Sequence, residues 1–207
     1  MFSERVQELL VPRSRNETRQ ATRRAVLKAT SRLFGERGFA STTIREIAQE
    51  AGVSVGTVMA AGDKEALLVE LFDDLIDQRQ QHIDSLDLDT SEPCGDSAIS
   101  IVEPFVALFE ERRELARTYA SVLVRGRHTS VVFTDLARRL IDVFEQLITA
   151  HGCTSRADTH RRAEALHSAY IGNLFIWAST TEQSGADLLT QLRKVFTAIC
   201  PPTGSNS

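Results

Sequence analysis

The chain has 207 residues, 42% of them apolar and 25% charged, which is the composition of a globular protein with a sizeable core and excludes a disordered chain. Its net charge of −4 is unevenly divided: residues 1–62 carry ten Lys or Arg against six Asp or Glu, and residues 63–207 carry fourteen against twenty-two. Only the front of the chain is therefore expected to meet a polyanion; a basic surface without a partner is the alternative.

Three features bear on the compartment. The first residues, MFSERVQELLVPR, carry charge within their apolar part and do not form a secretory signal. The longest uncharged run, 165–181, is too polar and slightly too short for a membrane span of ~20 residues. Three cysteines, Cys94, Cys153 and Cys200, are odd in number and far apart in sequence, which favours a reducing cytoplasm over a disulfide framework. We expect a cytoplasmic protein.

Helical spacing runs through almost the whole chain and hairpin signals are absent, so the predicted fold class is all-α with about nine helices. Residues 1–15 are predicted to be a flexible basic arm, broken at Pro12. A first helix is predicted from Asn16 to Arg37, with Gly38 ending it. Its buried stripe consists of Val26, Leu27, Thr30, Leu33 and Phe34.

A short second helix follows, capped by Ser41 or Thr42, and Glu46 would complete a capping box if Thr43 were the cap. Its predicted inward side chains are Ile44, Ile47, Ala48 and Ala51.

After a turn at Gly52, Ser54 is predicted to cap a third helix of barely two turns, from Val55 to Ala61. Gly62 ends this helix, and Asp63 caps a fourth helix that runs to about Asp84.

An acidic linker is predicted at 85–95, where Pro93 and Gly95 break regular structure. Pro104 should kink the next helix or start a new one, and residues 201–207 are expected to be disordered. The five helices predicted beyond the linker span 96–111, 112–125, 129–151, 155–183 and 185–199. The predicted organisation is a helix-turn-helix domain at 16–62, a connecting helix at 63–84, and an effector-binding and dimerisation domain at 96–200.

Residues 42–59 place two short helices about a glycine turn, which is the geometry of a helix-turn-helix whose second helix enters a major groove. The longer stretch from Thr22 to Leu68 resembles the N-terminal domain of the TetR family of transcriptional regulators. The matching elements are Leu33-Phe34, Gly38, Thr42-Thr43, Ile47-Ala48, Ala51-Gly52-Val53-Ser54, Gly56-Thr57 and Lys64-Glu65-Ala66-Leu67-Leu68. The resemblance implies an all-α homodimer whose C-terminal domain binds a small effector and holds two DNA-reading heads.

The recognition helix departs from the family pattern. Family members usually end it with aromatic residues and a histidine, whereas this chain has Met59, Ala60 and Ala61 there. Six residues separate Thr57 from Lys64 where seven is usual. Base reading is therefore expected to depend little on hydrogen bonds.

The predicted DNA contacts follow from residue chemistry. Thr43 and Arg45 would meet phosphate or a base edge, and Thr57 a phosphate or a thymine methyl group. Lys64, at the N-terminus of the fourth helix, would hold a phosphate. The full predicted set is Thr43, Arg45, Ser54, Val55, Gly56, Thr57, Met59 and Lys64. Arg13, Arg15 and Arg19 could reach an adjacent groove; an extension without a partner is the alternative.

Aromatic residues in the second half suggest an effector pocket, with Asn173, Tyr119 or Arg125 as its polar anchor; ordinary core packing is the alternative for each residue. The predicted pocket residues are Phe105, Phe109, Tyr119, Phe133, Tyr170, Asn173, Leu174 and Trp177. The last two helices could form a four-helix dimer interface, unless their stripes pack within one subunit. The predicted interface residues are Ala165, Ala169, Gly172, Ile176, Leu188, Leu192, Val195 and Phe196.

Other chemistries lack support in the sequence. His160 and His167 are seven residues apart, roughly 10 Å along a helix, which is too far for one metal ion without other ligands. No nucleophile elbow or phosphate loop occurs, so no enzyme, metal or cofactor is predicted. The sequence predicts a homodimeric regulator, a repressor released from a palindromic DNA operator by a small molecule. The alternative is a dimeric ligand-binding protein of the same fold that no longer reads specific DNA.

Overall fold

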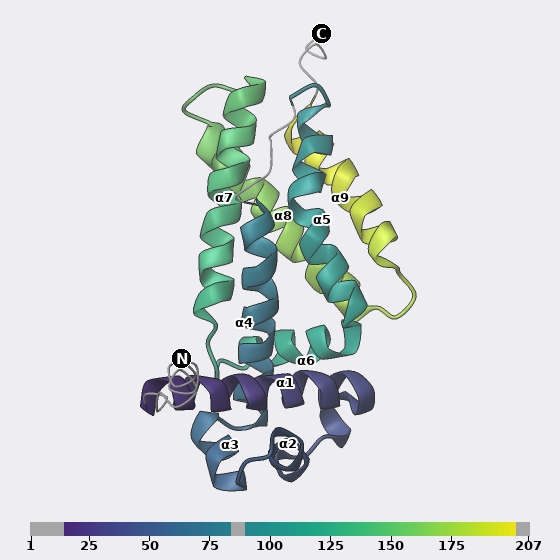
Figure 1. Ribbon diagram of the computed structural model, residues 1–207. Helices are drawn as coiled ribbons and strands as arrows, with labels where there is room; N and C mark the ends of the chain where they lie inside the picture. The colour runs from purple at the N-terminus through teal and green to yellow at the C-terminus, as the bar shows by residue number, and fades with distance from the viewer. Residues whose placement is uncertain (1–14, 84–89, 202–207) are drawn as a thin grey trace, which may run out of the picture. The chain divides into compact units, whose positions relative to one another are not determined.

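In the computed structural model, residues 15–83 and 90–201 are described, and every regular element among them is an α-helix (Figure 1). This confirms the predicted fold class. The chain forms two compact units, residues 1–68 and 69–207. Among the described helices, none has the length and apolar character that a membrane crossing requires. The predicted arm and tail fall largely outside the described residues, as do residues 85–89 of the predicted linker. Arg15 already belongs to the first helix, and the linker was predicted too long, because Cys94 and Gly95 are helical.

The first unit is built on α1 (Arg15–Ser41), whose buried face contains the predicted stripe together with Ala29. Gly38 interrupts this helix with φ 78° and ψ 164°, values that a residue without a Cβ adopts at little cost. One more turn continues to Ser41, so the helical segment is longer than the sequence predicted.

The cap of α2 (Ile44–Ala51) is Thr43, and the predicted caps Ser41 and Thr42 are wrong. The Thr43 hydroxyl accepts from the Glu46 amide, and the Thr43 amide donates to the Glu46 carboxylate at 2.8 Å. The hydrogen bonds that the Glu46 carboxylate accepts from the Thr43 hydroxyl and the Thr43 amide lower the pKa of Glu46. Thr42 is buried instead, and its hydroxyl donates to the Gly38 carbonyl at 2.9 Å. The choice of cap thus depended on which threonine the core buried.

The helices α3 (Val55–Ala61) and α4 (Lys64–Ile83) begin as predicted. The Ser54 hydroxyl accepts from the Thr57 amide, and the Asp63 carboxylate accepts from the Ala66 amide at 2.8 Å. Gly62 separates the two helices with φ 153°, and a Cβ there would lie 2.7 Å from the Ala66 Cβ. Glycine is therefore required at this junction.

The second unit contains the rest of α4 and five further helices: α5 (Cys94–Glu111), α6 (Arg113–Val124), α7 (Val131–His151), α8 (Thr159–Ser179) and α9 (Gly185–Ile199). Pro104 lies within α5, which is one helix, so the prediction that Pro104 starts a new helix is wrong. The ends of α8 lie several residues inside the predicted 155–183. Extensive contacts join α5 with α9 and α7 with α8.

Candidate nucleic-acid interface and ligand cavity

The helix α3 exposes apolar side chains. Its inner side is anchored by Val58, which is fully buried, whereas Val55 is 43% exposed and Met59 is 52% exposed. Such exposure of large apolar groups on one short helix leaves them available for a partner. The helix, with the sequence VGTVMAA, carries no charged or amide side chain, so its contacts with bases would be apolar.

The N-terminus of α3 also presents hydroxyl groups and open backbone. The Ser54 and Thr57 hydroxyls lie 2.8 Å apart and share one hydrogen bond, which holds both at the first turn. A Cβ at Gly56 would meet only the Ser54 hydroxyl, at 3.7 Å. The backbone at Gly56 is therefore open to a close approach from outside.

On α2, Arg45 is exposed and has no hydrogen bond or ion pair with another described residue. The Thr43 hydroxyl, by contrast, is engaged with the Glu46 carboxylate at 2.8 Å. Arg45 is therefore the better placed of these two residues for a direct contact with a base edge or phosphate.

Lys64 does not present a free ammonium group. Its Nζ donates to the carbonyls of Phe39 and Thr42, at 2.9 and 3.0 Å, and lies 4.3 Å from the centre of the Phe39 ring. The residue connects the start of α4 to the end of α1. The phosphate role predicted for Lys64 is therefore replaced by a structural one.

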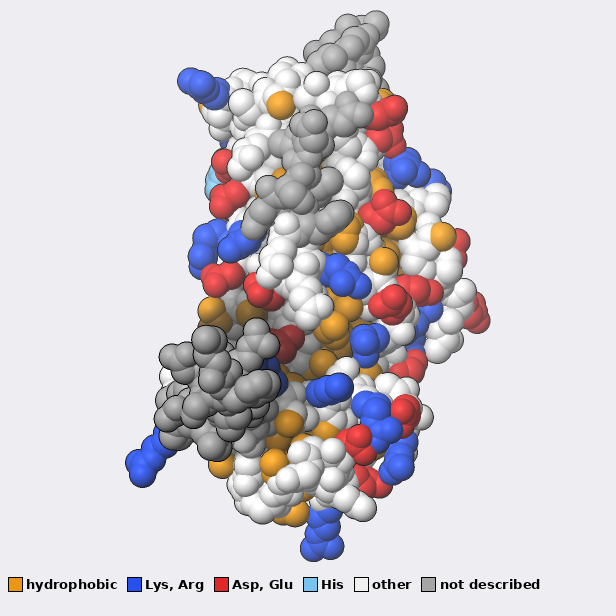
Figure 2. All heavy atoms as spheres, viewed as in Figure 1, with side chains coloured by type: hydrophobic (Ala, Val, Ile, Leu, Met, Phe, Trp, Pro, Cys, Tyr) orange, Lys and Arg blue, Asp and Glu red, His pale blue; other side chains and the backbone are white. Residues whose placement is uncertain are grey.

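Some basic side chains of the N-terminal region are paired with acidic neighbours. Arg37 pairs with Glu46 at 2.8 Å, and Arg32 pairs with Glu50 and, at 3.5 Å, with Glu36. Figure 2 likewise shows acidic side chains interspersed among the basic ones on the visible face. These pairs leave the net charge of the region unchanged, but they occupy two of its guanidinium groups.

The second unit encloses a cavity of about 360 Å³. Its lining comes from α5, α6, the connection between α6 and α7, the first turn of α7, and the last two turns of α8. The volume lies within the ~300–1,000 Å³ of small-molecule sites. Exposed Val124 and Phe175 contribute to this lining, so the cavity is bordered by apolar groups that also face solvent.

Of the predicted pocket residues, the structure brings five together around this cavity: Phe109, Tyr119, Phe133, Leu174 and Trp177. Tyr170 lines a separate space of only about 10 Å³. Phe105 is fully buried and lines neither space, so its assignment to the pocket is wrong. The assignment of Asn173 to the pocket is wrong for another reason, because the Asn173 side-chain amide donates to the Ala169 carbonyl of its own helix.

Sequence reasoning missed the aliphatic and hydroxyl residues of the lining and one histidine. They include Ala116, Ala120 and Leu123 on α6, and His128, Thr129 and Ser130 before α7. These types are common everywhere, and no spacing marks them as lining residues. The predicted polar anchor Arg125 is not among the lining residues.

Two polar groups of lining residues are buried without a hydrogen-bond partner in the described part of the chain. The Trp177 Nε1 is buried without a hydrogen-bond partner among the described residues. The Tyr119 hydroxyl is buried near Ser130 and Asp73 but has no hydrogen bond of ordinary geometry. Burial raises the pKa of Tyr119, so this hydroxyl stays a neutral donor.

Contacts link the cavity lining to α4 within the second unit. The Tyr119 ring stacks on Phe72 of α4, with centroids 4.5 Å apart. Ser130 donates to Asp73 of α4 at 2.5 Å, and burial raises the pKa of that carboxyl. A ligand that moves Tyr119 or Ser130 would therefore disturb α4.

The residues predicted for the dimer interface differ in exposure between α8 and α9. On α8, Ala165, Gly172 and Ile176 are exposed, with Ile176 at 62%, and Ala169 is half-buried. The predicted residues of α9 are Leu188, Leu192, Val195 and Phe196; Val195 is half-buried, and the other three are buried within the subunit. Assigning those three to a dimer interface is wrong, because the stripe of α9 packs against α5 and α8 of its own chain.

Together, an N-terminal helix-turn-helix and a second all-α unit with a ligand-sized cavity define the architecture of a DNA-binding transcriptional regulator. Residues 26–71 match the family model described as "Bacterial regulatory proteins, tetR family". This match identifies the N-terminal region as a DNA-binding domain of the TetR type of transcriptional regulator. No curated protein matches it significantly.

Solved structures share the fold over most of the chain. FadR from Thermus thermophilus, a TetR-family repressor in complex with lauroyl-CoA, is 24% identical with a TM-score of 0.63, over 86% of this chain and 92% of that one. A TetR-family regulator from Pectobacterium atrosepticum is 20% identical with a TM-score of 0.66, over 90% and 95%. A transcriptional regulator from Rhodococcus sp. RHA1 is 24% identical with a TM-score of 0.59, over 86% and 94%.

Proposed function

We propose that the protein is a repressor that reads a near-palindromic operator with α3 and Arg45. The observation that supports this is the outward position of Val55, Met59 and the unpaired Arg45 around an open backbone at Gly56. The two helix-turn-helix domains of the dimer would occupy successive major grooves about 34 Å apart. Apolar contacts would favour thymine methyl groups, and Arg45 would supply the charged contact.

One feature supports the rival function, a protein of this fold without sequence-specific DNA recognition: α3 has no side chain that can read a base edge with two hydrogen bonds. A mobility-shift assay on the DNA upstream of the gene separates the two functions. Binding that survives excess competitor DNA supports the repressor. Binding that is equal on all sequences and disappears with salt contradicts it.

Three variants test the proposed contacts. Arg45→Ala and Thr57→Val should weaken operator binding more than binding to random DNA, by about 1–3 kcal/mol each. Gly56→Ala introduces no strain into the protein, so any loss of affinity reports a close approach by DNA. Arg156→Ala, which removes an exposed charge in the second unit, is the matched control and should change nothing. Equal losses on operator and random DNA for Arg45→Ala and Thr57→Val would contradict their assigned roles.

For the effector, we infer an amphipathic molecule with an apolar body, since most of the cavity lining is apolar, with Phe109, Leu123 and Phe133 among its residues. The lauroyl-CoA complex of the similar Thermus protein makes dodecanoyl-CoA and dodecanoate suitable probes. Ala120→Leu fills part of the cavity and should weaken binding about tenfold or more, whereas Ala157→Leu, at an exposed position, should not. Equal binding of the probe to the wild type, Ala120→Leu and Ala157→Leu would show that the probe binds outside this cavity.

The proposed release works through α4, which begins in the first unit and continues into the second. A ligand that displaces Tyr119 or Ser130 would shift α4 through Phe72 and Asp73 and so bias the DNA-reading head. Ser130→Ala should keep ligand affinity within a few-fold while reducing the effect of ligand on DNA affinity. Unchanged coupling in Ser130→Ala would exclude this route.

The dimer is proposed to use the exposed face of α8 around Ile176. Ile176→Glu should shift the protein to a monomer in sedimentation analysis and weaken operator binding. Val131→Glu is the matched control, because Val131 is an apolar residue 70% exposed on α7. If both variants remain dimeric, the α8 face is not the interface.

A further inference from the structure

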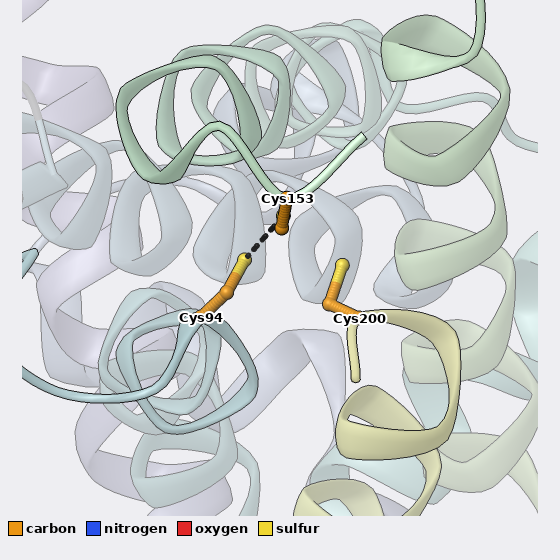
Figure 3. Close-up of side chains that lie close together, drawn as sticks. All are labelled: Cys94, Cys153 and Cys200. Carbon is orange, nitrogen blue, oxygen red and sulfur yellow. Dashed lines mark hydrogen bonds between the residues drawn. The ribbon is translucent and has the colours of Figure 1, made fainter. Parts of the chain in front are cut away.

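The three cysteines of the chain meet in the second unit although they are far apart in sequence. Cys94 opens α5, Cys153 lies in the connection after α7, and Cys200 follows α9 (Figure 3). Their sulfur atoms all lie within 4.8 Å of one another, and the Cys94 and Cys153 sulfurs are 3.6 Å apart. All three are free thiols, with Cys94 and Cys200 buried and Cys153 half-buried. This is the one such cluster of metal-ligating side chains in the described part of the chain.

The frame around the cluster is closely packed. Gly95 allows the start of α5 to approach the end of α9, because a Cβ there would lie 2.9 Å from the Thr197 amide nitrogen. Arg162 on α8 donates to the carbonyls of Cys153 and Ile199, at 3.3 Å each. The segments that carry all three sulfurs are therefore held in place by contacts that do not involve the thiols.

The spacing of the sulfurs fits one metal ion. Three sulfurs at about 2.3 Å from a central ion lie about 4 Å apart in a trigonal plane. The observed separations, 3.6 Å for one pair and at most 4.8 Å for the others, require only small side-chain rotations. No carboxylate or imidazole belongs to this cluster, so hard cations such as Mg²⁺ lack their preferred oxygen ligands.

We propose that Cys94, Cys153 and Cys200 form a trithiolate site for a soft d¹⁰ metal ion, with Cu(I) as its best match. Thiolate ligands select Cu(I) and Zn²⁺ among biological metals, and structural Zn²⁺ sites are four-coordinate. Cu(I) is satisfied by three sulfurs, so it needs no further ligand here. Binding converts three thiols to thiolates with release of three protons and no change of oxidation state. The guanidinium of Arg162 stands beside the site and offsets part of the resulting negative charge.

The competing chemistry is a disulfide between Cys94 and Cys153, whose sulfurs lie 3.6 Å apart. A disulfide would use two sulfurs and require an oxidant, whereas a metal ion uses all three. The convergence of three sulfurs is therefore better explained by coordination. The two chemistries predict opposite results for Cys200, which only the metal site requires.

The test is anaerobic titration of the full reduced chain with Cu(I), with bathocuproine disulfonate as competing chelator and native mass spectrometry for stoichiometry. One Cu(I) per chain is expected, with the melting temperature raised by about 5–10 °C at a hundredfold excess over Kd. Each of Cys94→Ser, Cys153→Ser and Cys200→Ser should lower Cu(I) affinity at least about 100-fold. Zn²⁺ should bind more weakly than Cu(I) in the wild type.

Two controls keep the result interpretable. His160→Ala removes an exposed imidazole beside Glu145 and Glu164 and should leave Cu(I) binding unchanged. The melting temperature of each metal-free serine variant shows whether it folds, and Cys153→Ser, at the half-buried position, is the least disruptive. The proposal is overturned if Cys200→Ser retains the wild-type affinity for Cu(I). It is also overturned if the wild type binds Cu(I) no more tightly than its serine variants do. Cu(I) binding that is lost only in His160→Ala overturns it as well.

Discussion

The two units differ in where their functional residues come from. In the first unit, the proposed DNA contacts lie within residues 43–59, on two short helices whose ends are set by their own caps. In the second unit, the cavity draws side chains from Phe109 to Ala178, and the thiol cluster from Cys94 to Cys200. A site built locally follows a sequence pattern, whereas a site built by packing distant helices leaves no local pattern.

The largest expected effect tests whether the two units are independent. Ile47 is fully buried in the first unit, so Ile47→Ala should destabilise that unit by about 2–5 kcal/mol. Hydrogen exchange should increase in residues 15–68 and stay unchanged in α5 to α9. The exposed Gln49→Ala on the same helix is the control for changes unrelated to the core. An equal increase in both units would show that they unfold as one.

Lys64 distinguishes a structural role from a DNA contact. Its ammonium makes two hydrogen bonds to carbonyls, so Lys64→Met should destabilise the first unit by about 2 kcal/mol in a thermal melt. The exposed Lys28→Met on α1 should be nearly neutral. If Lys64→Met melts like the wild type but loses about one unit of the salt dependence of DNA binding, Lys64 contacts phosphate after all.

The cap of α2 should contribute a smaller amount. Thr43→Ala removes the hydroxyl that accepts from the Glu46 amide and should cost about 1 kcal/mol of unfolding free energy. Thr43→Ser keeps the acceptor and should retain most of that stability. Thr22→Ala, whose hydroxyl bonds only to a carbonyl within α1, is the matched control. A Thr43→Ala variant as stable as the wild type would contradict the capping role.

The smallest effect concerns Asp73 in the second unit. Burial raises the pKa of Asp73 in the folded state, so the ionised carboxylate lowers the free energy of unfolding at neutral pH. This destabilisation disappears once the pH falls below the pKa of an aspartate in the unfolded chain, which is about 3.9. Asp73→Asn should therefore stabilise the protein at pH 7 by no more than about 0.5 kcal/mol, because solvent screens a half-exposed group. The gain should vanish near pH 4. A lower melting temperature of Asp73→Asn at pH 7 would show that the charge is needed for the bond from Ser130.

The sequence predicted the outline of both units. Periodic apolar residues located nearly all the helices, and the junctions at Gly52, Ser54 and Gly62 were predicted because turns and caps depend on a few adjacent residues. The errors lay where burial chose between equivalent candidates. Thr42 rather than Thr43 was buried, so the cap of α2 moved by one residue.

What the sequence by itself determined is the all-α class, the helix-turn-helix and its unusually apolar recognition helix, since each is set by neighbours along the chain. The tertiary structure alone decided that the stripe of α9 packs inside the subunit, and that Lys64 turns to the carbonyls of Phe39 and Thr42. It also decided that Tyr119 lines the cavity while Phe105 does not, and that three distant cysteines meet. These outcomes depend on which helix faces pack together, and residues with the same chemistry fit either arrangement until the packing is known.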